Sequence, residues 1–217
     1  MMKHFMILTA MILVITCAVM AQETNPPQLV VPTGDGTPVL LDGEFTWGEW
    51  ADADSLRISD DILLRFKQYK EHFFLGIECP NIIAPVVDLF LAVDTNETLQ
   101  LHAAAQLGER KWPAGQEPGE FLWGRTAYWY ANEFRYNSPM TDSLVRVEGM
   151  KWEDAVKKAS FRSKGTEYQI MMGKIPFDRW FFRLEVGAAG AYDKPTVFPA
   201  GTTADNLTGW GQFILKE

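Results

Sequence analysis

Cysteine is scarce in this sequence of 217 residues, which holds only Cys17 and Cys79. Residues 1–21 have the form of a signal peptide, so Cys17 leaves with them and Cys79 remains alone. A lone cysteine excludes an internal disulfide and a Cys-x-x-Cys metal or redox site. Cys79 ends an apolar stretch that starts at Phe73, which predicts a buried structural thiol rather than a nucleophile.

Long apolar runs are lacking after residue 21. The N-terminal segment joins Lys3 to an apolar run over 5–19 and ends on the small residue Ala21. This predicts cleavage, export, and a mature chain 22–217 with no membrane span, which starts with a short polar leader at 22–27. Two alternatives remain open. An uncleaved anchor would need roughly 20 apolar residues, and a lipoprotein attached through Cys17 would have Thr16 in an unusual place.

Positive charge is also in short supply. The chain has 20 basic and 28 acidic residues, for a net charge of −8, and loss of Lys3 brings the net charge to −9. Nucleic acids need a basic surface, so we exclude them as partners. The sequence has no Gly-x-Ser-x-Gly elbow, no His-Glu-x-x-His and no phosphate loop. We therefore predict that the protein is not an enzyme, and at most an accessory to polysaccharide hydrolysis.

Short extended runs take the place of long amphipathic helices. Residues 62–69 alternate apolar and polar side chains, and 72–78 follow after a Lys-Glu turn, which predicts a hairpin. Residues 86–93 are nearly all apolar, as in a central strand. Shorter runs, including 99–106, 144–147, 155–161, 168–175, 182–186 and 211–215, predict further strands. About ten short strands indicate an all-β antiparallel sandwich of the jelly-roll type over 28–217, with one short helical turn at 175–180.

A series of short motifs runs along the whole mature chain. It opens with Asp42-Gly43 and Trp50-Ala51, continues with Asp88-Leu89-Phe90-Leu91-Ala92-Val93-Asp94 and Ile175-Pro176, and closes with Trp210-Gly211. In this order the motifs resemble the family 9 carbohydrate-binding module and the wider group of DOMON-like β-sandwiches. The resemblance implies a poly- or oligosaccharide ligand, held between tryptophan rings with charged and amide groups on its hydroxyls. It also implies that calcium can stabilise the loops.

Tryptophan residues outside the expected strands are the main candidates for contact with a sugar. An indole covers the apolar face of a pyranose, while polar groups must hold its rim. Trp50 is expected to plug the end of the sandwich, and Trp129 lies within a strand whose faces the sequence does not assign. The candidate binding residues are Trp112, Trp123, Arg125, Trp129, Trp47, Asn206 and Trp210. Asp94 and Asn96 offer oxygen ligands of the kind calcium prefers, although an Asx-turn explains them equally simply.

Two other functions remain open at this point. Some DOMON-like proteins hold haem b through Met with His or Lys, and here Met171, Met172, His102 and Lys174 would have to supply those ligands. Buried methionine is, however, common core filler. The other possibility is a structural surface protein that keeps the fold without a ligand.

Overall fold

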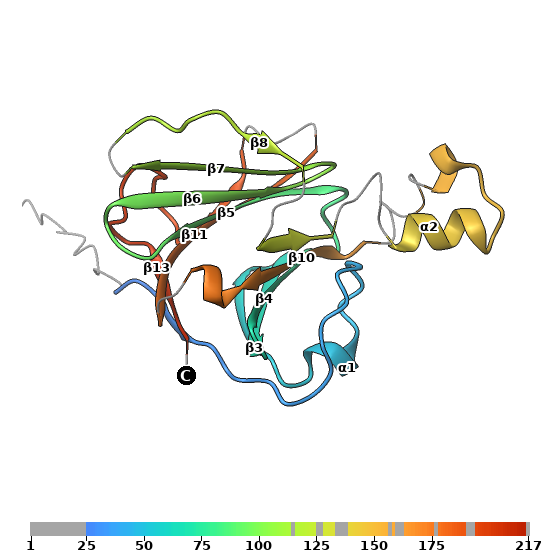
Figure 1. Cartoon of the computed structure of the whole chain (residues 1–217), viewed down its shortest axis with the longest axis horizontal. Helices are drawn as coiled ribbons and strands as arrows, with labels where there is room; N and C mark the ends of the chain where they lie inside the picture. Colours follow the sequence, from blue (N-terminus) through green and yellow to red (C-terminus); the bar gives the residue numbers. More distant parts are fainter. Residues whose placement is uncertain are drawn as a thin grey trace, which may run out of the picture.

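Two β-sheets packed face to face form the body of the protein (Figure 1). The computed structural model describes residues 25–113, 116–124, 128–132, 139–155, 158, 163–175, 178–189 and 194–215. The predicted all-β sandwich is confirmed. The predicted signal peptide, residues 1–21, lies outside the described residues. No helix in the described ranges is long and apolar enough to cross a bilayer.

The larger sheet has eight strands, and its strands are antiparallel except where β1 runs parallel to β13. Its order is β1 (Gln28–Val30), β13 (Gly211–Ile214), β11 (Arg179–Ala188), β5 (Pro85–Ala92), β6 (Glu97–Ala103), β7 (Leu107–Pro113) and β8 (Leu122–Trp123), with β12 (Thr196–Phe198) paired to β11. The expected central strand at 86–93 is β5. It lies in the middle of the order, and its inward residues Val87, Leu89 and Leu91 are buried in the core between the sheets.

The smaller sheet has the order β2 (Asp54–Ser59), β3 (Ile62–Tyr69), β4 (His72–Glu78), β10 (Gly165–Met171) and β9 (Trp129–Ala131). The predicted hairpin is the β3–β4 pair, with Tyr69 opposite His72 beside the turn. Side chains from the inner faces of both sheets fill the core, where the Phe182 and Phe213 rings stack at 4.1 Å. Cys79 is buried there, and burial raises its pKa to about 12, so it remains a neutral thiol.

Helical segments are short: α1 (Trp47–Trp50), α2 (Pro139–Arg146) and η1 (Met172–Lys174). The predicted strand at 144–147 is wrong, because Leu144 belongs to α2 and packs against Ala155 in a small cluster of its own. The predicted strand at 155–161 is also wrong at its start, since 152–155 are helical. The α2 segment projects away from the two sheets (Figure 1). Of the predicted helical turn at 175–180, residues 176–177 lie outside the description, and Arg179 and Trp180 begin β11.

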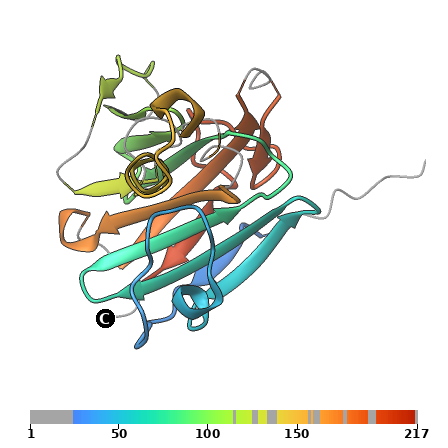
Figure 2. The same cartoon turned by 90° about the vertical axis from the view of Figure 1, so that its right-hand side faces the viewer.

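The segment 31–53, which includes α1, crosses the outer face of the five-stranded sheet (Figure 2). Lys67 of β3 is fully buried beneath it and donates to the Thr37 carbonyl (2.9 Å), the Glu49 carbonyl (2.5 Å) and Asp52 Oδ1 (2.6 Å). A buried ammonium group needs such partners, because burial without them is costly. Lys67 therefore fastens the segment to the sheet.

Candidate functional site

Polar and aromatic side chains gather on the outer face of the eight-stranded sheet. Side chains that are direct partners across neighbouring strands point to the same face. One row of partners across β11, β5, β6, β7 and β8 is Glu185, Asp88, His102, Gly108 and Trp123. The register thus brings together residues that lie up to 97 positions apart in the sequence.

A second row on the same face lies next to the first. Its members across β11, β5, β6 and β7 are Arg183, Phe90, Gln100 and Arg110. Trp112, two residues after Arg110, extends the face along β7. The outer face therefore carries two arginines, two acids and several aromatic rings in adjoining positions.

Hydrogen bonds link the side chains of the two rows. Asp88 is buried, and its Oδ1 accepts from Gln100 Nε2 at 2.6 Å and lies 2.9 Å from His102 Nδ1. Because the Gln100 amide donates to Asp88, its Oε1 is turned toward Arg110, whose Nε donates to it at 2.7 Å. Asp88 therefore positions Arg110 through Gln100.

Aromatic rings enclose the Arg110 guanidinium. Its Cζ lies 4.4 Å from the Phe121 ring centroid and 5.4 Å from that of Trp112, both within cation–π range. Burial lowers the pKa of Arg110, and the charge of Asp88 opposes that effect. The guanidinium is a partly desolvated cation in a fixed orientation.

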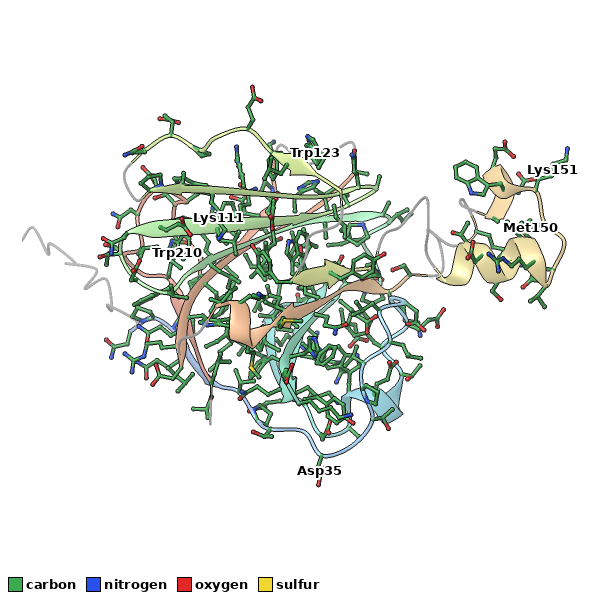
Figure 3. All side chains as sticks on the ribbon, viewed as in Figure 1. Asp35, Lys111, Trp123, Met150, Lys151 and Trp210 are labelled. Atoms are coloured by element: carbon green, nitrogen blue, oxygen red, sulfur yellow. The ribbon has the colours of Figure 1, made fainter. Side chains whose placement is uncertain are left out.

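Trp123 forms an exposed platform at the edge of the sheet (Figure 3). Its side chain is 54% exposed, stacks on Phe121 at 4.9 Å between centroids, and meets the His102 ring edge-on at 5.7 Å. Gly108 makes this position available, because a Cβ there would lie 2.7 Å from Trp123 Cε3. Of the predicted binding residues, Trp123 is the one whose side chain the structure shows with an exposed indole.

The close approach at Gly108 leads to a prediction. Gly108→Val should displace the Trp123 ring and weaken any ligand contact made by that ring as strongly as Trp123→Ala does. Chemical denaturation of the variant provides the control, since Gly108 lies near the sheet edge and loss of global stability should be small. Full ligand binding by folded Gly108→Val would show that the ring position is unimportant.

Three other candidate binding residues, Trp112, Trp129 and Trp210, are buried. Trp112, predicted in a loop, lies on β7 and packs with Phe90 and Trp210. Trp210 also donates from Nε1 to the Thr203 carbonyl at 2.9 Å. Trp129 lies in the main core, where it stacks on Tyr168 and donates to Glu109. These rings support the fold rather than offer a face to solvent.

The remaining predicted residues lie in loops or are not described, and the loop with Asn206 packs against Phe90 and Trp210 through Ala204 and Leu207. Asn206 is exposed, and its Oδ1 accepts from the Thr208 backbone N–H at 2.9 Å. Asp94 Oδ1 accepts from the Asn96 backbone N–H at 2.8 Å, so these two residues form an Asx-turn. Arg125 and the side chain of Trp47 lie outside the described residues.

The proposed haem ligands do not come together with His102. His102 lies on the outer face of the eight-stranded sheet, whereas Met171 ends β10 in the other sheet, with Met172 and Lys174 in η1. Met172 Sδ accepts from Gln68 Nε2 at 3.2 Å. A cavity of about 170 Å³ beside Lys174 is smaller than the roughly 300–1,000 Å³ typical of ligand pockets.

Three carboxylates meet where the segment 31–53 contacts β10: Asp42 and Glu49 of the segment and Glu167 of the strand each place an oxygen within 4.8 Å of the others. Their oxygens already accept from N–H groups. Glu167 Oε2 accepts from the backbones of Asp42 (3.0 Å) and Gly43 (2.7 Å), and its Oε1 accepts from Trp50 Nε1 (3.0 Å). These bonds form a hydrogen-bonded clamp between the segment 31–53 and Glu167 of β10. Trp50 is buried, but it packs with Val39 and Phe74 on the outer face of the five-stranded sheet, so the prediction that it plugs the end of the sandwich is wrong.

Sequence reasoning missed Gln100, Arg110 and Phe121 as members of the site. A weak signal existed, because Gln100 and His102 are two residues apart in a strand and must share a face. The sequence does not reveal the partner strand, because residues 108–119 are rich in glycine and proline, which favour turns.

Comparison with family models finds no match, and comparison with curated proteins finds none either. Among solved structures, the fold is similar to a "putative carbohydrate-binding protein" from Bacteroides uniformis. The TM-score is 0.46 and the sequence identity 7%, and the match covers 88% of this chain and all of the other.

Proposed function

We propose that this protein is a non-catalytic carbohydrate-binding domain that takes a sugar on the outer face of its eight-stranded sheet, with Trp123 as the platform. The observation that carries the proposal is the exposed Trp123 ring, held over Gly108 and in contact with His102, while the neighbouring Phe121 ring also contacts the fixed Arg110 guanidinium. An apolar ring next to fixed donors and acceptors is what a pyranose requires. The protein would be exported, and distantly related to the family 9 modules that its motifs resemble.

Trp123→Ala tests this proposal, with Trp152→Ala as a matched control. Both indoles are exposed, but Trp152 follows α2 on the projecting segment. The wild type is titrated with a panel of soluble neutral and acidic oligosaccharides by calorimetry. We expect a saturable response that Trp123→Ala weakens by at least about tenfold, or 1.4 kcal/mol, and that Trp152→Ala leaves unchanged. Equal binding by wild type and Trp123→Ala would refute the site, and no binding to any member would refute the function.

A further inference from the structure

Arg110 differs from Arg183, the other arginine of its row, because it has no ionic partner among the described residues. Arg183 Nη2 lies 2.6 Å from Glu185 Oε1, so that charge is already paired. Within the described residues, no carboxylate comes within the 4.0 Å of an ion pair with Arg110. Asp88 reaches it only through the Gln100 amide.

The guanidinium of Arg110 is nevertheless held in one orientation. Its Nε is occupied by Gln100 Oε1, and the rings of Phe121 and Trp112 lie within cation–π distance of it. Among the described residues, the acceptor on the terminal edge is the Gly119 carbonyl, which lies 3.5 Å from Nη1 at the outer limit of a hydrogen bond. Within the part of the chain that the structure describes, the Nη1–Nη2 edge therefore has no close acceptor.

A fixed, partly desolvated guanidinium with a free terminal edge suits a flat or tetrahedral anion. Two parallel N–H···O bonds from arginine to a carboxylate are shorter and stronger than bonds between neutral groups. Aromatic flanks exclude water and so strengthen this attraction. The partly buried cation has lost part of its hydration, and a neutral hydroxyl would replace that stabilisation less well than an anion.

The exposed Trp123 ring and the Arg110 guanidinium both contact Phe121. Phe121 stacks on Trp123 on one side and carries the Arg110 guanidinium at 4.4 Å. A sugar chain that has one ring on Trp123 would have to extend past Phe121 to bring an anionic substituent to Arg110.

We propose that the glycan bound at this face carries an anionic group, the carboxylate of a uronic acid or a sulfate ester, and that Arg110 binds this group while Trp123 receives the sugar ring. The inference rests on the proposed function and specifies its ligand class. The net charge of −8 repels polyanions at long range, so the contact with Arg110 provides selectivity rather than attraction at a distance.

The test compares each acidic sugar with its own neutral form. Short oligogalacturonates and oligomannuronates are titrated beside their methyl esters, and a sulfated galactose oligosaccharide beside its desulfated form. We expect the wild type to bind at least one acidic form about tenfold more tightly than the matching neutral form. Arg110→Gln should abolish this difference and Arg110→Lys should restore part of it, since the ammonium keeps the charge without the fork. Arg146→Gln removes an exposed arginine from α2 and should change nothing.

The outcomes distinguish a preference for anionic glycans from carbohydrate binding as such. If acidic and neutral forms bind wild type equally, or Arg110→Gln keeps the preference, the inference is wrong while carbohydrate binding stands. If no sugar binds at all, both fail. Preference for a sulfated over a carboxylated ligand would identify which anion the site takes, with Arg110 still its partner.

Discussion

Replacing Lys67 by methionine is expected to lower the free energy of unfolding by about 3–5 kcal/mol, the cost of breaking a buried charged contact by removal of one partner. The Lys67 ammonium is fully buried and donates to two carbonyls and one carboxylate. Methionine fills a similar volume, so the loss would come from the unpaired acceptors of Thr37, Glu49 and Asp52 rather than from a void. Urea denaturation followed by fluorescence measures the change.

Lys151→Met is the control, because Lys151 is exposed on the projecting segment (Figure 3). It should alter stability by less than about 0.5 kcal/mol. A loss below about 1 kcal/mol for Lys67→Met would mean that the segment 31–53 does not depend on this contact. Proteolysis within 31–53 should also become faster in Lys67→Met, since the segment loses its fastening to the sheet.

Glu167 makes stability fall as pH rises. Burial raises its pKa to about 8 from the ordinary 4.5; hydrogen bonds from Gly43 and Trp50 oppose this, and the charges of Asp42 and Glu49 add to it. Below about pH 4.5 the carboxyl group is protonated in both the folded and the unfolded protein, so it does not affect the free energy of unfolding. Between about pH 4.5 and pH 8 the unfolded chain releases the proton and the folded protein keeps it, so stability is lost over this range.

Glu167→Gln isolates this effect because the amide does not titrate. The unfolding free energy of the wild type relative to the variant should fall by a few kcal/mol from pH 5 to pH 8.5. The relative value matters, since Asp52 has a lowered pKa and contributes in the opposite direction. A difference that is flat with pH would contradict the raised pKa. Stabilisation of wild type alone by millimolar calcium would contradict the clamp, and point to a cation between the three carboxylates.

Sequence could predict the strands in which apolar and polar residues alternate and those in which nearly all residues are apolar. The 62–78 hairpin was predicted with its bounds, because its period of two and its turn are local properties. The 144–147 segment was misassigned, because four residues cannot distinguish a strand from a helix whose apolar side meets Ala155. That contact joins residues that are too far apart in the sequence for a local pattern to reveal it.

The site was predicted only in part, for a related reason. Trp123 stood out as an aromatic residue among turn formers, and the structure places it on an exposed edge. Trp112 has the same kind of neighbours in the sequence. It lies, however, within β7, where it is paired with Thr98 of β6, and its ring is buried. Arg110 and Gln100 become neighbours through strand register alone, and register is set by the whole sheet.

The most direct test of the account is a ¹H–¹⁵N NMR titration that follows the eight tryptophan indole N–H signals as the best-binding oligosaccharide is added. We predict that the Trp123 signal, assigned by its loss in Trp123→Ala, shifts saturably. The signals of buried Trp129 and Trp180 should stay in place. A saturable titration in which Trp152 shifts and Trp123 does not would contradict the account, because the sugar would then bind on the projecting segment and not on the outer face of the eight-stranded sheet.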